Sequence, residues 1–237
     1  MSDVQQKAMS MIMGGLLVVS MLLLGREAAI YTKEVSSAKV MVSEEKPCIV
    51  IDPGHGDFDP GKVGINGALE KDINLAIALK LKEFLEASDI RVVMTREDDS
   101  GLYDKNASNK KVQDMKNRIG IIDAESPVLT VSIHQNSYTE EYVHGAQVFY
   151  YNTSAEGQEL AEYIQRRLII TLDPENNRQV KGNDSYYLLK KTGSPIVIVE
   201  CGFLSNSLEA EKLCDDYYQE KIAWAIHMGV VQYLNGK

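Results

Sequence analysis

The sequence predicts a single α/β domain with a twisted, mostly parallel (mixed) sheet, flanked by helices and preceded by an N-terminal hydrophobic segment. Three observations lead to this prediction. The 237 residues are 44% apolar and 25% charged, as in a globular enzyme of one domain. From Cys48 onward, short runs rich in Val and Ile alternate with segments of helical periodicity. This alternation is typical of strands joined by helices in a layered fold.

The elements are expected in the following order. Strands are predicted at 48–52, 90–95, 127–133, 146–151 and 195–200, and helices at 70–87, 112–124 and 155–171. Asn206, with Glu209 three residues later, resembles a capping box that opens a further helix. Ile222, Ile226 and Val230 then mark one face of a terminal helix. No internal repeat or second domain is evident.

The N-terminal segment has a different character. Residues 8–24 carry no charge and would span roughly 25 Å as a helix, slightly short of a bilayer's hydrocarbon core. A small-x-small cleavage site is missing, which favours an uncleaved anchor over a secretory signal, while a buried core helix is disfavoured because every face is apolar. The expected organisation is a signal peptide or membrane anchor at 1–25, a tether at 26–46 and an exported catalytic domain at 47–237.

Charge and cysteine content exclude some functions. The net charge is −9 and no basic stripe occurs, so nucleic acid is not an expected partner. The three cysteines (Cys48, Cys201 and Cys214) give no complete disulfide framework. Cys48 and Cys201 lie inside predicted strands and are expected to be buried free thiols.

Polar residues follow three of the predicted strands at their carboxyl ends. Residues 52–56 follow the first strand, 132–136 end the third, and Glu200 closes the fifth. In open α/β sheets, ligands gather at this edge. Glu70 begins the first long helix, after the glycine-rich segment 61–67 that can turn back toward the sheet. The sequence therefore predicts a functional site at the carboxyl edge.

His55, Glu70 and His134 form a candidate zinc site. Catalytic zinc takes three ligands of these types, whereas magnesium and calcium prefer all-oxygen sites. Glu200 would then be free to act as a base. The ligand separations are long and irregular, so a plainer interpretation stays open. His55 could be a solvated turn residue, His134 a hydrogen-bonded core residue, and Glu70 a carboxylate at the positive end of a helix.

Other polar residues are interpreted more plainly. Glu200 is hard to explain by structure alone, because a carboxylate that closes a buried strand is costly without a partner. His144, in a turn, and His227, inside the terminal helix, are expected to be structural. Arg96 and Arg118 could hold the domain together through ion pairs, and the sequence does not decide this.

Four segments resemble the signature segments of the zinc-dependent N-acetylmuramoyl-L-alanine amidases (amidase type 3 family). They are IDPGHGDFDPGKVG, LEKDINL, VSIHQNS and VIVECGFLSN, in the family's order, and the similarity covers about residues 47–235. The resemblance implies an α/β domain with a mixed sheet. It implies zinc held by His55, Glu70 and His134, with Glu200 as the catalytic base.

Two details of the sequence bear on this resemblance. Asp57 stands where many members carry a second glycine after the His-Gly pair, and only a local change is expected there. The inserted helix that blocks the site in some division amidases is not evident after Asn136, because the chain runs quickly into the next strand. Asn136 lies two residues past a predicted ligand and is a candidate for binding substrate.

The resemblance implies a substrate and a place of action. The bond expected to be cut is the amide between the lactyl group of N-acetylmuramic acid and L-alanine in peptidoglycan. An anchor, a short tether and a bare catalytic domain resemble the sporulation members of the family, which act on the spore cortex so that muramic δ-lactam can form for germination. This implies export, into the forespore intermembrane space. Targeting would come from the membrane segment, or from a lipoprotein or other spore partner.

Two other classes of function stay open. One is another zinc hydrolase that acts on peptidoglycan, such as a carboxypeptidase or a deacetylase, and the ordered match of four segments argues against it. The other is a non-catalytic protein of the same fold that binds the wall or a partner. Such a protein would be expected to have lost Glu200 or a metal ligand, yet all four residues are present.

Overall fold

The computed structural model describes residues 3–41 and 46–236, which belong to two compact units divided after residue 45. In the first unit, α1 (Asp3–Met41) is a single helix. Its stretch Val4–Ile30 has a hydropathy of 2.1, is not buried, and is long and apolar enough to cross a membrane, which fits a signal or an anchor. The helix continues through most of the segment 26–46, of which residues 42–45 lie outside the described residues.

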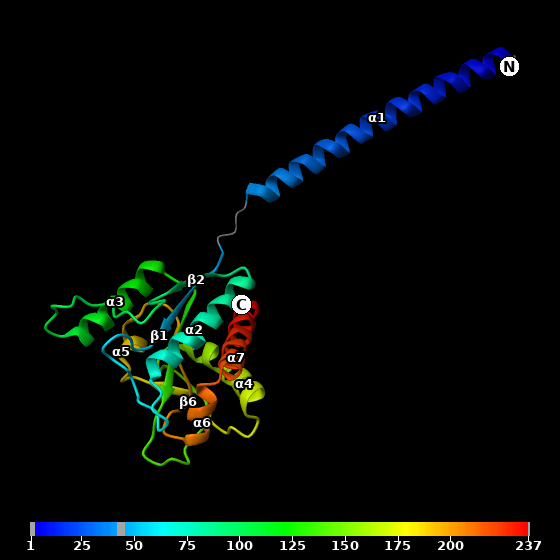
Figure 1. The fold of residues 1–237 in the computed structure, drawn as a ribbon. Helices are drawn as coiled ribbons and strands as arrows, with labels where there is room; N and C mark the ends of the chain where they lie inside the picture. The colour runs from blue at the N-terminus through cyan, green and yellow to red at the C-terminus, as the bar shows by residue number, and fades with distance from the viewer. Residues whose placement is uncertain (1–2, 42–45, 237) are drawn as a thin grey trace. The chain divides into compact units, whose positions relative to one another are not determined.

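The second unit alternates strands and helices (Figure 1). The strands are β1 (Cys48–Pro53), β2 (Arg91–Met94), β3 (Leu129–Asn136), β4 (Gln147–Tyr151), β5 (Lys181–Asn183) and β6 (Ile196–Phe203). The helices are α2 (Glu70–Ala87), α3 (Lys110–Glu125), α4 (Ala155–Leu172), α5 (Tyr187–Lys191), α6 (Ser207–Leu213) and α7 (Asp216–Asn235). Each strand and helix expected from the sequence is found within a few residues of its predicted place.

The strands form one mixed sheet in the order β2-β1-β3-β6-β4-β5 among the residues described. β2, β1, β3 and β6 are mutually parallel. α2 and α3 carry the chain back to the same end of the sheet between β1, β2 and β3, and the chain reaches β6 through β4, α4, β5 and α5. β4 follows β3 after a short connection and pairs antiparallel with β6, and β5 pairs parallel with β4. The predicted mostly parallel, mixed sheet is confirmed.

Helices cover both faces of this sheet (Figure 1). On one face α7 packs between α2 and α4, and the three helices bury a large apolar cluster with alternate strand residues such as Ile51 and Val199. On the other face α3 and α5 bury a smaller cluster, to which the intervening residues Val50 and Ile198 contribute. Alternation of side chains along each strand therefore sends neighbouring residues to different layers.

The structure corrects the sequence prediction in two respects. β3 extends to Asn136 and β6 to Phe203, because backbone pairing between them continues past His134 and Glu200, with an irregularity in register. His134, expected just past its strand, thus lies inside β3, and Glu200, expected as the last residue of its strand, is followed by three more residues of β6. The short elements β5 and α5 were not predicted, since three and five residues are too few to show a periodic apolar pattern.

The start of α6 and two of the cysteines also bear on predictions from the sequence. Asn206 caps α6 by accepting a hydrogen bond from the Glu209 backbone N–H, as expected. The Glu209 carboxylate instead accepts from the backbone N–H groups of Phe203 and Gly145, so it joins α6 to neighbouring segments rather than closing a capping box. Cys48 and Cys201 are buried free thiols, as predicted.

Candidate metal centre

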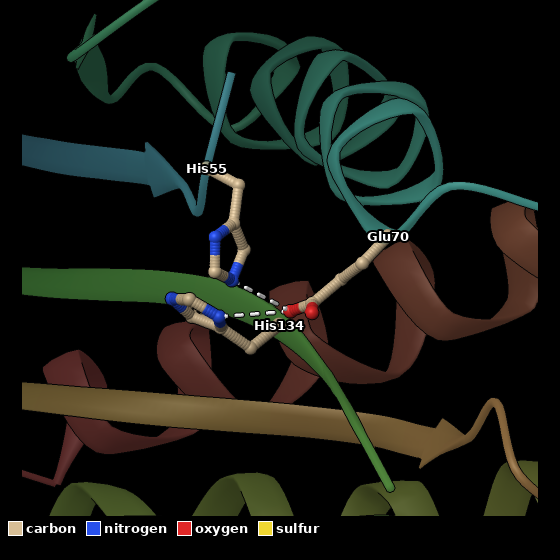
Figure 2. A group of neighbouring side chains, drawn as sticks. All are labelled: His55, Glu70 and His134. Carbon is tan, nitrogen blue, oxygen red and sulfur yellow. Dashed lines mark hydrogen bonds and ion pairs between the residues drawn. The ribbon is translucent and has the colours of Figure 1, made fainter. Parts of the chain in front are cut away.

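Three of the predicted site residues meet at the carboxyl edge of the sheet (Figure 2). His55 lies in the loop after β1, Glu70 is the first residue of α2, and His134 is on β3. Glu70 Oε1 lies 3.3 Å from His55 Nε2 and 3.0 Å from His134 Nδ1. One donor atom from each residue lies within 4.8 Å of the others. Segments far apart in the chain therefore converge on one point.

The spacing of these atoms suits a small cation. Zinc with nitrogen and oxygen ligands about 2.0–2.1 Å away in a tetrahedral arrangement sets neighbouring donor atoms roughly 3.3 Å apart. The two distances to Glu70 Oε1 are close to this value. Two imidazoles and one carboxylate also form a mixed donor set that is typical of zinc rather than calcium. The three residues could thus hold a metal ion.

Two glycines allow the ligands to approach so closely. A Cβ at Gly54 would lie 2.2 Å from the His134 ring, so any other residue would push that ring away. A Cβ at Gly61 would lie 2.6 Å from Glu70 Oε2, and Gly61 also has a φ of +67°. His55 itself has a φ of 64°, a conformation that is uncommon outside glycine and tends to cluster at functional sites.

Glu70 is held as an ionised carboxylate. Burial by itself would raise its pKa, but hydrogen bonds with His134 and His55 outweigh burial and hold the pKa well below its ordinary range. Its oxygens also accept from the backbone N–H groups of Lys62, at 2.7 Å, and Gln135, at 3.0 Å. The start of α2 favours negative charge as well. The carboxylate is therefore ready to serve as a ligand.

The centre lies on the sheet face that α3 and α5 cover. Ser132 and His134 are two residues apart on β3 and point to the same face, as do Ile198 and Glu200 on β6. His134 and Glu200 are direct register partners on these neighbouring strands. Since adjacent strands lie about 4.8 Å apart, register alone brings Glu200 beside a candidate ligand.

Glu200 combines burial with an unused acceptor. Its side chain is 7% exposed, and Oε2 has no hydrogen-bond partner among the described residues. Burial raises the pKa of Glu200 to about 7, although the charge of His134 opposes the shift. A carboxyl group with this pKa can accept and release a proton near neutral pH. The sequence prediction that Glu200 is a partly buried carboxylate is thus confirmed.

Tyr186 is a residue of this site that sequence reasoning missed. It lines the same cleft as Glu200, and its hydroxyl group interacts with the Glu200 carboxyl group. Burial, together with the charge of Glu200, raises the pKa of Tyr186 to about 12, so its hydroxyl stays protonated and can donate. Tyr186 immediately precedes the short helix α5, in a segment without periodicity, and no signal in the sequence could have found it.

A cleft of ≈ 270 Å³ opens over the candidate centre. Besides His55, His134 and Glu200, its walls include Met115 of α3 and Leu188 of α5, and it is bounded by Asp52, Gly54, Asp59, Lys111, Asp114, Arg118, Tyr186, Tyr187 and Ile198. Asn136 is not among the described residues that line it. The Asn136 amide oxygen accepts from the Ser137 backbone N–H, and a role in binding substrate stays a prediction.

Two arginines hold the backbone that leads to His55. Arg118 forms an ion pair with Asp52 at 2.7 Å and donates to the carbonyl oxygens of Pro53 and His55. Arg96 donates to the carbonyl oxygens of Pro53 and Gly54. The sequence did not decide whether the two arginines form ion pairs. Arg118 does so with Asp52, whereas these hydrogen bonds of Arg96 go to main-chain carbonyl groups. Together they fix three successive carbonyl groups beside the candidate centre.

The other two histidines, His144 and His227, each lie within hydrogen-bond distance of a nearby group. His144 is exposed in the connection before β4, where its Nδ1 lies 3.0 Å from the Tyr142 carbonyl oxygen. His227 is buried on α7, with Nε2 2.8 Å from Ser88 Oγ. Both positions agree with the structural interpretation drawn from the sequence.

The chain is similar in sequence to proteins that are already known. The family model described as N-acetylmuramoyl-L-alanine amidase matches residues 49–232. The chain is 37% identical over 192 residues to the germination-specific N-acetylmuramoyl-L-alanine amidase of Bacillus subtilis, which covers 80% of each chain. It is 35% identical over 224 residues to the N-acetylmuramoyl-L-alanine amidase LytC of the same organism, covering 94% of this chain and 42% of that one.

Solved structures give the same result. The CwlD amidase of Clostridioides difficile, in complex with the GerS lipoprotein, superposes with a TM-score of 0.79 at 44% identity. The match covers 81% of this chain and 100% of that chain. An N-acetylmuramoyl-L-alanine amidase of Clostridium difficile 630 superposes with a TM-score of 0.73 at 31% identity, covering 82% of this chain and 100% of that chain.

Proposed function

The chain belongs to the N-acetylmuramoyl-L-alanine amidase family, and from that premise we propose a zinc enzyme of the spore cortex in which Glu200 is the catalytic base. Its activity is hydrolysis of the N-acetylmuramoyl-L-alanine amide in peptidoglycan. One observation carries the proposed mechanism: the buried carboxylate of Glu200, with Oε2 unpaired among the described residues, lies beside a three-residue group that could hold a metal ion.

The proposed ligands are His55, Glu70 and His134, and the proposed ion is zinc. When bound, zinc supplies Lewis acidity, so that a carbonyl carbon is attacked more easily and a water loses its proton more easily. The chain's contribution is a pre-arranged set of donors. The ionised Glu70 carboxylate balances positive charge, and Gly54 and Gly61 leave room for the imidazole rings and for this carboxylate.

Glu200 is proposed to move the proton. Its Oε2 accepts a proton from the attacking water, and the same carboxyl group then donates that proton to the nitrogen of the departing L-alanine. A pKa of about 7 suits both steps, since the group must be able to gain and lose a proton at neutral pH. Tyr186 stays protonated in the same cleft, so its hydroxyl group is able to donate to the carboxylate. Asn136 remains a candidate contact for the substrate.

The biological setting is proposed from the relatives. The germination-specific amidase of Bacillus subtilis supports a role in germination. We place this role in the spore cortex, where removal of peptide would allow muramic δ-lactam to form. The complex of the CwlD amidase with the GerS lipoprotein supports a lipoprotein partner for this chain too. The apolar stretch of α1 supports a membrane link, with an anchor or signal at 1–25, a tether at 26–46 and the catalytic domain at 47–237 in the forespore intermembrane space.

The chemistry is tested by mass spectrometry of peptidoglycan digested with the purified full chain, with zinc content measured on the same sample. We expect intact stem peptides that begin with L-alanine, glycan strands freed of peptide, and one zinc ion per chain. Peptides shortened from their carboxyl ends would indicate a carboxypeptidase instead. A fully active chain without zinc would contradict the metal assignment.

The base is tested by Glu200→Gln, which keeps the shape of the side chain but cannot accept the proton. We expect kcat to fall about 10²–10⁴-fold, as is typical when a general base is removed, with zinc content retained. Glu209→Gln is the matched control, because Glu209 is also a largely buried carboxylate whose pKa burial raises, but it bonds backbone groups outside the cleft. Equal loss of activity in both variants would show that charge removal, not base chemistry, is responsible.

The cortex role is tested in sporulating cells that carry Glu200→Gln. Their spore cortex should lack muramic δ-lactam, and their spores should fail to germinate. A normal δ-lactam content would place the enzyme's action elsewhere in the cell wall while leaving the amidase activity intact.

A further inference from the structure

Asp59 lies beside the candidate ligand His55 and contacts its second ring nitrogen. His55 Nδ1 lies 3.1 Å from Asp59 Oδ2, while His55 Nε2 lies 3.3 Å from Glu70 Oε1. The two nitrogens of one imidazole therefore have different partners, one at the candidate metal centre and one outside the three-residue group. Asp59 itself belongs neither to that group nor to the proposed proton transfer.

A tight turn fixes Asp59 in this place. Gly56 and Asp59 exchange two backbone hydrogen bonds, at 3.0 and 3.1 Å, so the chain folds back on itself directly after His55. Asp59 Oδ1 accepts from the backbone N–H of Gly61, the glycine that packs against Glu70. With Oδ1 held in this way, Oδ2 is directed at the imidazole.

Helix α3 supports the same arrangement from the other side. Lys111, in its first turn, places Nζ 3.1 Å from Asp59 Oδ2. Arg118, two turns further along, donates to the His55 carbonyl oxygen at 2.6 Å. α3 thus holds the His55 main chain directly and the His55 ring through Asp59.

We propose that Asp59 is a positioning residue that sets the tautomer and the orientation of His55. A neutral imidazole has one N–H and one lone pair. With the N–H on Nδ1 donated to Asp59, the lone pair is on Nε2 and points toward Glu70 and the metal centre. Carboxylates in this position also make the imidazole a better ligand. The inference rests on the proposed metal site and adds a residue to it.

The test is zinc affinity of the full chain, measured by competition with a chromophoric chelator. We expect Asp59→Ala to weaken zinc binding about 10–100-fold, as is typical for loss of a partner that orients a ligand. Asp59→Asn should weaken binding less, because its amide oxygen still accepts from Nδ1–H. Asp57→Asn is the matched control: it removes the same charge from the same turn, but the Asp57 carboxylate contacts Tyr103 rather than His55.

A second readout makes the test independent of activity and of folding defects. Nitrogen-15 NMR of histidine-labelled, zinc-loaded wild-type chain should show the His55 proton on Nδ1, and a proton on Nε2 would overturn the inference. Zinc affinity of Asp59→Ala equal to that of the wild type would also overturn it. If instead the wild type bound no zinc, or His55→Ala bound zinc as tightly as the wild type, the proposed metal site itself would fail.

Discussion

The two faces of the sheet are built on different principles. The face under α2, α4 and α7 is closed by apolar side chains that interlock across three long helices. The face under α3 and α5 has a smaller apolar cluster, and toward the carboxyl edge it turns polar, with Asp52, Ser132, His134 and Glu200 in neighbouring positions. One face therefore supplies stability alone, while on the other face stability and the candidate site depend on the same residues.

The coupling on the polar face comes from a buried ion pair. The side chains of Arg118 and Asp52 are each 2% exposed, and Asp52 also accepts hydrogen bonds from Thr95 and Ser132. Burying two charges is costly, and the cost is recovered only if every polar atom finds a partner. The same guanidinium group donates to the His55 carbonyl oxygen, so the ion pair and the loop that carries His55 form one network.

Arg118→Met should have the largest effect on stability. It leaves the Asp52 carboxylate buried without its cation and should lower the free energy of unfolding by about 3–5 kcal/mol. Zinc affinity should fall with it, because the His55 carbonyl loses a donor. Urea unfolding and chelator competition measure the two effects. The control is Lys80→Met, whose pair with the 86% exposed Asp216 lies on the apolar face and should be worth at most about 1 kcal/mol.

Ile164→Ala should have a somewhat smaller effect, confined to stability. Ile164 is fully buried on α4 in the apolar cluster, so truncation should cost about 2–5 kcal/mol through lost burial and a residual cavity. Zinc affinity and kcat of the folded protein should match the wild type. A variant of this kind that lost zinc would show that the two faces are not separable as described.

Lowering the pH should cause the smallest of the three losses of stability, through protonation of Asp52. Burial alone would raise the pKa of Asp52, but the charge of Arg118 and hydrogen bonds from Thr95 and Ser132 outweigh it and lower the pKa from 3.8 to about 2. Because the folded pKa is the lower one, Asp52 contributes stability that is complete above about pH 4 and is lost as the pH falls through about 2. The ionised Asp52 carboxylate therefore contributes roughly 2 kcal/mol to the free energy of unfolding.

The contribution of Asp52 is measured as the difference in the free energy of unfolding between the wild type and Asp52→Asn. Measured from pH 5 down to pH 2, the wild type should lose stability more steeply than the variant, which has no carboxyl group to protonate at this position. Parallel curves would mean that the Asp52 carboxylate is not held in its ionised form by Arg118.

Much of the fold could be predicted from apolar pattern. Runs such as 48–52 and 195–200 are long enough to show strands, and Ile73, Ile77 and Leu81 repeat at helical spacing because one face of α2 is buried. The predicted strands 127–133 and 195–200 end before β3 and β6 do. Backbone pairing extends both strands, and a local sequence pattern does not show which strand pairs with which. β5 and α5 were missed for want of length.

For the site, the sequence by itself predicted which residues to consider: His55, His134 and Glu200 stand at the carboxyl ends of apolar strands and Glu70 at the start of a helix, and the resemblance of these segments to a known family gave them proposed roles. The tertiary structure decided how they meet. The register of β3 against β6 sets Glu200 beside His134, and helix packing brings Arg118 to Asp52, 66 residues away in the chain. Tyr186 comes beside Glu200 only through packing, whereas Asp59 is held by a local turn and by Lys111 of α3. The physical reason is that local pattern reports burial and periodicity, whereas a site requires distances between segments that only packing can fix.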